Sequence, residues 1–154
     1  HFYDTYETKD GKYVSLGSIE PQFYALLREK AALTDADFDA QHDKSKWPAL
    51  KAKVAAAIRT KTRDEWDALM LGTDVCYAPV LSLDEAPKHP HNVARETFLT
   101  IDGVVQPAPA PRFSRTASKV HGPAPQIGAD NDSALADWGF SADAVAALKQ
   151  SGAI

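Results

Sequence analysis

The sequence predicts an α+β fold in which a small antiparallel sheet packs with several helices. Two pairs of β-prone segments are each joined by an Asp-Gly turn, one at Asp10-Gly11 and the other at Asp102-Gly103, and this dipeptide is typical of β-hairpins. The segments between the two pairs carry apolar residues at helical spacing. Because the strands come in adjacent pairs rather than alternating with helices, an antiparallel sheet is favoured over a parallel one.

Composition excludes several classes of protein. The chain has 154 residues, of which 44% are hydrophobic, so it can bury a core of its own. A net charge of -4 without a basic cluster argues against a nucleic-acid partner. No apolar run is long enough to span a membrane. The single cysteine, Cys76, excludes an internal disulfide and is typical of a reducing compartment, so we expect a cytoplasmic protein.

The first hairpin, residues 2–8 with 12–17, leads into a sharp corner. Pro21 suits the first position of a helix, which we expect to cover residues 21–32. Glu20 is then the N-cap residue, with its carboxylate near the positive end of the helix and its backbone restricted by the following proline. Two interpretations stay open on these residues alone. Glu20 is either an ordinary helix cap or a fixed carboxylate in an active site.

Two further helices should follow. We expect one to begin near Ser45, with Ser45 as its cap and Pro48 in its first turn. Another should begin at the capping box formed by Thr62 and Glu65 and end at Gly72. The apolar stripes of these helices are interpreted as core rather than as cofactor contacts. They comprise Trp47, Leu50, Val54, Ala57 and Ile58 in the first, and Trp66, Leu69 and Met70 in the second.

The second half of the chain changes in character. Residues 75–81 should form a short apolar segment that Pro79 confines to an edge or a bend. Ser82 and Glu85 form a second capping-box pattern for a brief helix. Residues 97–105 predict the second hairpin. Five prolines between residues 107 and 125 predict an extended stretch, followed by helices at 132–138 and 141–150. We therefore divide the chain into residues 1–106, 107–130 and 131–154.

Most catalytic motifs are absent. There is no glycine-rich nucleotide loop and no G-x-S-x-G elbow. His89 and His91 lack the spacing of a helical zinc motif, so no metal site is expected. Cys76 is interpreted as a small buried thiol rather than a nucleophile. Glu20 is the one modest candidate, although proton abstraction and return need at least two positioned groups.

Two longer motifs carry a resemblance. Residues 6–24, YETKDGKYVSLGSIEPQFY, and residues 109–116, PAPRFSRT, resemble the branch of the class III CoA-transferase (CaiB/BaiF-like) family that racemises 2-methylacyl-CoA thioesters. Trp47-Pro48, residues 62–66 and residues 76–80 match the same family in the same order, as does the C-terminal stretch 139–154. The resemblance covers essentially the whole chain.

The resemblance implies an isomerase of fatty-acid and lipid metabolism, of which this chain would be the C-terminal part and inactive alone. A proton would leave the α-carbon of the acyl-CoA and return through an enolate, without metal or redox cofactor. Residues 1–106 would form the small domain, while the remainder would return to a large domain that binds most of the CoA and supplies a His and an Asp as bases. Such proteins form interlocked homodimers, with the active site between the large domain of one subunit and the small domain of the other.

The resemblance also implies roles for single residues. Glu20 matches the glutamate that hydrogen-bonds the catalytic His, and we name it as the candidate catalytic residue. Ile19 matches a position that lines the acyl pocket and is the candidate substrate-binding residue. Arg112 and Arg115 could contact the CoA phosphates or form interdomain ion pairs, and the second is favoured. A carboxylate beside a catalytic His would hold one tautomer and stabilise the protonated ring.

Two other functions stay open. A CoA-transferase of the same family would need an aspartate nucleophile from outside this chain. A non-catalytic interaction domain would use its C-terminal helix, with Val145, Leu148 and Ile154, to dock on another surface.

Overall fold

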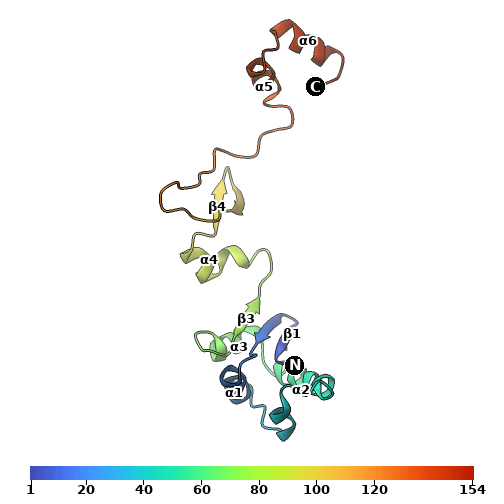
Figure 1. Ribbon diagram of the computed structural model, residues 1–154, viewed down its shortest axis with the longest axis vertical. Helices are drawn as coiled ribbons and strands as arrows, with labels where there is room; N and C mark the ends of the chain where they lie inside the picture. The colour runs from blue at the N-terminus through green and yellow to red at the C-terminus, as the bar shows by residue number, and fades with distance from the viewer. The chain divides into compact units, whose positions relative to one another are not determined.

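The computed structural model describes residues 1–154 and has the predicted α+β fold (Figure 1). It contains two small antiparallel sheets, one with three strands and one with two. The chain separates by its internal contacts into two units, residues 1–86 and 87–154, and each is described by itself. The division after residue 106, which follows the domains of the family, stays a prediction.

The first unit is a three-stranded sheet with helices. The central strand β2 pairs antiparallel with β1 on one side and β3 on the other. The first hairpin is therefore confirmed, and Gly11 takes the positive φ of +73° that its turn requires. In chain order the elements are β1 (Tyr3–Glu7), β2 (Tyr13–Gly17), α1 (Pro21–Lys30), the 3₁₀ turn η1 (Ala36–Ala40), α2 (Trp47–Ile58), α3 (Arg63–Met70) and β3 (Tyr77–Val80).

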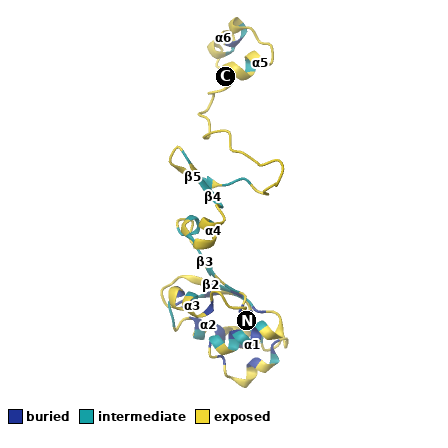
Figure 2. Cartoon of the chain, turned by 90° about the vertical axis from the view of Figure 1, so that its left-hand side faces the viewer, coloured by how far each residue is buried: buried dark blue, intermediate teal, exposed yellow.

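The hydrophobic core lies between one face of this sheet and the helices. Apart from Val145, every buried residue belongs to the first unit, as the dark blue segments of Figure 2 show. Alternate strand residues point inward, as the period of a strand requires, whereas Tyr3 and Tyr13 on the other face are exposed. The core combines Tyr6, Val14 and Leu16 of the sheet with Tyr24 and Leu27 of α1, Leu50, Val54 and Ile58 of α2, and Trp66 and Met70 of α3.

The helix starts test the predicted caps. The box of Thr62 and Glu65 is confirmed, because each side chain pairs with the backbone N–H of the other. The prediction for Ser45 is wrong. Its hydroxyl donates to the Asp43 carboxylate at 2.6 Å, and α2 begins at Trp47 with Lys46 as N-cap and no side-chain cap. Ser45 therefore lies one residue before the N-cap, in a local turn in which its backbone N–H and hydroxyl both donate to Asp43.

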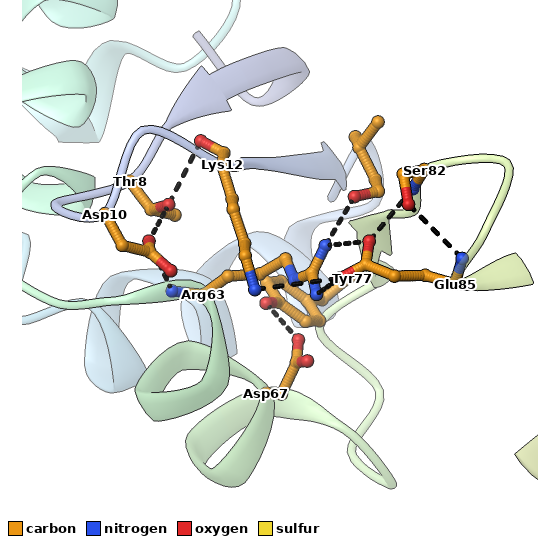
Figure 3. A network of polar contacts seen from close by, with 9 residues as sticks. Thr8, Asp10, Lys12, Arg63, Asp67, Tyr77, Ser82 and Glu85 are labelled. Atoms are coloured by element: carbon orange, nitrogen blue, oxygen red, sulfur yellow. Dashed lines mark hydrogen bonds and ion pairs between the residues drawn. The ribbon is translucent and has the colours of Figure 1, made fainter. Parts of the chain in front are cut away.

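Strand β3 lies at the edge of the sheet, as Pro79 predicted, and its exit is fixed by a charged network (Figure 3). The Arg63 guanidinium donates to both Glu85 carboxylate oxygens, at 2.9 and 2.6 Å, and to the Val80 carbonyl at 2.9 Å. Ser82 and Glu85 form the predicted reciprocal bonds, but a 3₁₀ turn, η2 (Ala86–Lys88), follows in place of an α-helix.

The second unit contains the second predicted hairpin and the predicted pair of C-terminal helices. Its elements are α4 (Pro90–Ala94), β4 (Phe98–Ile101), β5 (Val104–Pro107), α5 (Asn131–Asp137) and α6 (Ala142–Gln150). Between β5 and α5 no helix or strand forms. Ser141 caps α6 by accepting from the Ala144 N–H at 3.3 Å, and Val145 is buried. No helix of the chain has the length and apolarity needed to cross a membrane.

Two polar groups of this unit have local structural roles. His89 is the N-cap of α4, and its Nδ1 accepts from the His91 N–H at 3.3 Å. Arg112 donates to the backbone carbonyls of Arg95 and Glu96. These bonds tie the proline-rich stretch to the segment before β4.

Candidate active site at the β2–α1 corner

Residues 17–20, which we call the elbow, join the central strand to the first helix. Glu20 is the N-cap of α1, with φ -70° and ψ 145°, and Pro21 occupies the first helical position. The Glu20 carbonyl accepts the first helical hydrogen bond, from the Tyr24 N–H at 2.9 Å. The predicted corner is therefore present, with the extended conformation that a following proline favours.

The Glu20 carboxylate does not cap the helix. It forms no side-chain cap hydrogen bond, no ion pair, and no other hydrogen bond within the chain, and the residue is exposed. A capping side chain normally accepts a backbone N–H of the first turn. The interpretation of Glu20 as an ordinary cap therefore does not describe its side chain, whose oxygens are free to accept hydrogen bonds from outside the chain.

Ser18 holds the elbow in place through hydrogen bonds of its side chain and of its backbone. Its side chain is completely buried, and its hydroxyl donates to the Val75 carbonyl at 2.5 Å. Its backbone N–H donates to the Phe2 carbonyl at 3.0 Å, and the neighbouring Gly17 N–H donates to the Cys76 carbonyl at 2.8 Å. The elbow is thus bound to the start of β1 and to the segment before β3.

Gln41 holds the elbow in place through hydrogen bonds to two of its backbone carbonyls. Its buried side-chain amide donates to the Ser18 carbonyl at 3.2 Å and to the Ile19 carbonyl at 2.8 Å. The backbone carbonyl of Gln41 in turn accepts from the indole N–H of Trp47 at 2.9 Å. Nothing in the sequence pattern pointed to Gln41, because it lies in a polar stretch more than twenty residues from the elbow. A buried glutamine can be recognised only once the fold is known.

Two apolar side chains are exposed at the elbow and beside it. Ile19, the predicted substrate-binding residue, is 46% exposed, and Tyr3 at the start of β1 is 68% exposed. A groove of about 480 Å³ crosses the adjoining sheet, with Tyr3, Gly17, Cys76 and Tyr77 among its lining residues. Tyr3 was not among the sequence-predicted site residues, since the alternation of β1 alone does not show which face stays uncovered.

The prediction for Cys76 is wrong, because its thiol is exposed rather than buried. Cys76 has a positive φ of 57°, which turns the chain sharply just before β3 and carries the side chain outward. Partial desolvation raises the pKa of the thiol, and the carboxylates of Glu20 and Asp74 raise it further. A raised pKa disfavours the reactive thiolate, so Cys76 is still not a suitable nucleophile.

The chemistry open to the elbow is set by its one carboxylate. It presents a single carboxylate on a rigid corner, beside exposed apolar side chains, and no group of three or more His, Cys, Asp or Glu side chains is arranged to hold a metal ion. Abstraction and return of a proton need at least one further positioned group. The geometry suits a carboxylate that accepts a hydrogen bond from a base on another domain or subunit.

Comparison with known proteins shows the family of the chain. The model of CoA-transferase family III matches residues 1–131. The chain is 39% identical over 150 residues to the α-methylacyl-CoA racemase of Mus musculus, and 38% identical over 146 residues to that of Homo sapiens. These matches cover 96% and 94% of this chain but only 39% and 38% of the relatives. This chain therefore spans less than two fifths of the length of those racemases.

Among solved structures, the crystal structure of Rv3272 from M. tuberculosis superimposes with a TM-score of 0.67 at 19% identity. The match covers 84% of this chain and 37% of that one. At this level of identity the likeness concerns the fold.

Proposed function

This chain belongs to CoA-transferase family III, and from that premise we propose that it forms the C-terminal part of a 2-methylacyl-CoA racemase, with residues 1–106 as the small domain. The similarity to two racemases along nearly the whole chain supports this assignment. The observation that carries it is the Glu20 carboxylate, which is held on a rigid corner and forms no hydrogen bond or ion pair within its own chain. A carboxylate in that state is available to a partner that the racemase reaction requires.

In the proposed reaction a histidine base removes the proton from the carbon next to the thioester carbonyl. The C–H electron pair moves into an enolate, and a proton returned on the opposite face gives the other enantiomer. The chain supplies the carboxylate that accepts the N–H of that histidine, holds one tautomer, and stabilises the imidazolium while it carries the proton. Ile19 and Tyr3 provide apolar contacts for the acyl chain. No metal or redox cofactor takes part.

The histidine and the second base, an aspartate, would come from a large domain, which would also hold most of the CoA. The exposure of Glu20 and Ile19 supports an interlocked homodimer in which this corner faces the large domain of the other subunit. The C-terminal helices would return to the large domain, where the exposed side chain of Ile154 would find a partner. The cytoplasm stays the predicted compartment.

The test measures α-proton exchange of a 2-methylacyl-CoA in deuterated water, followed by mass spectrometry of the recovered thioester. In the complete racemase subunit that carries this chain, Glu20→Gln should slow exchange on the order of 100-fold, because a neutral amide cannot stabilise the imidazolium. Glu29→Gln, at an exposed site on the same helix, is the matched control and should exchange normally. The 154-residue chain alone should not catalyse exchange.

An unchanged exchange rate in Glu20→Gln would overturn the role of Glu20. Transfer of CoA from the thioester to a carboxylate acceptor, without deuterium at the α-carbon, would replace the racemase with a CoA-transferase. If neither reaction occurred, the chain would belong to an interaction domain.

A further inference from the structure

One side chain controls the two carbonyl groups that precede Glu20. The amide nitrogen of Gln41 donates one N–H to the Ser18 carbonyl at 3.2 Å and the other to the Ile19 carbonyl at 2.8 Å. Because both neighbours are acceptors, only the NH₂ end of the amide can face them. We propose that Gln41 is a positioning residue that fixes the backbone from which the Glu20 carboxylate extends in the proposed racemase reaction.

Backbone geometry explains how Gln41 acts on Glu20. The Ile19 carbonyl belongs to the rigid peptide plane that joins Ile19 to Glu20, so fixing its direction restricts φ of Glu20 together with ψ of Ile19. On the other side, Pro21 confines Glu20 to extended values of ψ. The observed φ of -70° and ψ of 145° are therefore held from two sides, one by a side-chain hydrogen bond and the other by a ring. Only the side-chain torsions of Glu20 remain free.

Gln41 is itself held by a chain of contacts that runs through Trp47 and Phe2 back to the elbow. The Trp47 indole donates to the Gln41 carbonyl at 2.9 Å, and its ring packs edge-on against Phe2 with centroids 5.9 Å apart. The Phe2 carbonyl accepts the Ser18 N–H at 3.0 Å, which leads back to the elbow. A residue supported in this way can transmit a precise geometry, whereas a mobile glutamine could not.

The chemistry of the site selects an uncharged side chain with two donors. A carboxylate would present its own lone pairs to the two carbonyls, and an apolar side chain would leave both without their donor. The selection bears on rate as well as on stability, since a shift of a catalytic group by about 1 Å can cost on the order of 100-fold in rate.

The first experiment compares Gln41→Met with wild type in the complete racemase subunit. Met keeps the length and most of the volume of the side chain but donates no hydrogen bond. We expect kcat to fall about 10-fold with KM for the acyl-CoA nearly unchanged, because a misdirected Glu20 weakens the transition state and not the binding of substrate. Gln150→Met, at an exposed position of α6, is the matched control and should leave both constants unchanged.

A double-mutant cycle separates positioning from general stability. If Gln41 acts through Glu20, Gln41→Met should lose nearly all its effect on kcat in the Glu20→Gln background. If Gln41 only stabilises the fold, the same fold-change should persist in both backgrounds, and the proposal is overturned. The inference rests on the proposed function, and the cycle shows which of the two has failed. An unchanged kcat in Glu20→Gln removes the role proposed for Glu20 in that function, whereas a slow Glu20→Gln with an unchanged Gln41→Met removes only the role of Gln41.

A second variant covers the case in which Gln41→Met does not fold. Gln41→Glu has nearly the same shape, and its carboxyl group can donate a hydrogen bond only when protonated. Burial beside two carbonyls raises the pKa of such a group, so kcat relative to wild type should recover as the pH is lowered from 8 to about 5. Gln150→Glu should keep a constant ratio to wild type over the same range. A ratio for Gln41→Glu that is equally flat would overturn the proposal.

Discussion

The two ends of strand β2 are held by different chemistry. At the elbow end, neutral groups do the work: the Ser18 hydroxyl and the Gln41 amide donate to backbone carbonyls. At the turn end, the supporting groups are charged. The Arg63 guanidinium holds the Glu85 carboxylate in two hydrogen bonds, and Lys12 lies 3.6 Å from the same carboxylate. Figure 3 shows how this network also reaches the first hairpin through Asp10.

The two ends differ in whether their carboxylate can still accept a hydrogen bond from a partner. Glu85 is used up in supporting the fold, and its hydrogen bonds with Arg63 hold the pKa of that carboxyl far below its usual range. Glu20, at the opposite end, has no cation and no donor from its own chain. A neutral scaffold orients the backbone without neutralising a nearby charge. The elbow can therefore be rigid while its carboxylate stays free for a partner.

The largest change in stability should come from the charged end. Arg63→Met removes a buried guanidinium together with its hydrogen bonds to Glu85 and to the Val80 carbonyl. We expect the free energy of unfolding of the chain to fall by about 2 to 3 kcal/mol, below the usual cost for a fully buried pair because Glu85 can rehydrate. Urea unfolding followed by the fluorescence of buried Trp66 measures it. If Arg63→Met lost no more unfolding free energy than Ser18→Ala, the charged end would not be the stronger support.

A smaller loss is expected at the neutral end. Ser18→Ala leaves the Val75 carbonyl without its donor inside the core, which should cost about 1 to 2 kcal/mol. The same urea titration applies. Ser133→Ala, at an exposed hydroxyl of α5, is the control and should unfold like wild type. A Ser18→Ala chain as stable as wild type would mean that the elbow does not depend on this bond.

The two ends should also differ in pH dependence. The folded-state pKa of Glu85 lies below its ordinary value of 4.5, so its contribution is complete above about pH 4.5 and is lost as the pH falls further. The difference in unfolding free energy between wild type and Glu85→Gln should therefore shrink in acid. The difference between wild type and Ser18→Ala should stay constant over the same range, since neither a hydroxyl nor a carbonyl titrates there. Parallel pH profiles for the two variants would contradict this.

The smallest effect should come from Lys12. Its ammonium and the Glu85 carboxylate are both partly exposed, at 43% and 35% of the side chain, and solvent-exposed pairs contribute little. Lys12→Met should unfold within error of wild type in moderate salt. A loss as large as that of Arg63→Met would show that the turn end depends on net charge rather than on the bidentate geometry of the arginine.

The sequence predicted the parts of the fold that depend on local signals. The Asp10-Gly11 turn, the start of α1 at Pro21 and the box at Thr62 were all found, because each depends on residues only a few positions apart. The predicted cap at Ser45 was wrong because Asp43 holds Ser45 in a turn before the helix, which begins two residues later at Trp47. Of the site, the corner at Glu20 could be predicted.

Its supports could not be predicted in the same way. Gln41 meets the elbow across more than twenty residues, and a polar loop has no period that reveals contacts of that kind. The turn at Cys76 depends on the positive φ of that one residue. A cysteine in the sequence does not predict a positive φ.

The proline of the edge strand has a consequence for association. In the register of β2 and β3, Val14 lies opposite Pro79, and the Gly17–Cys76 bond three positions further along marks the alternating hydrogen-bonded pairs. Pro79 therefore falls at a position whose backbone nitrogen points away from the sheet. At Pro79 the outer rim of β3 therefore lacks one of the N–H groups that an added strand would use. Pairing of another strand along this rim is disfavoured at Pro79, so a partner that approaches here relies more on side chains than on backbone hydrogen bonds.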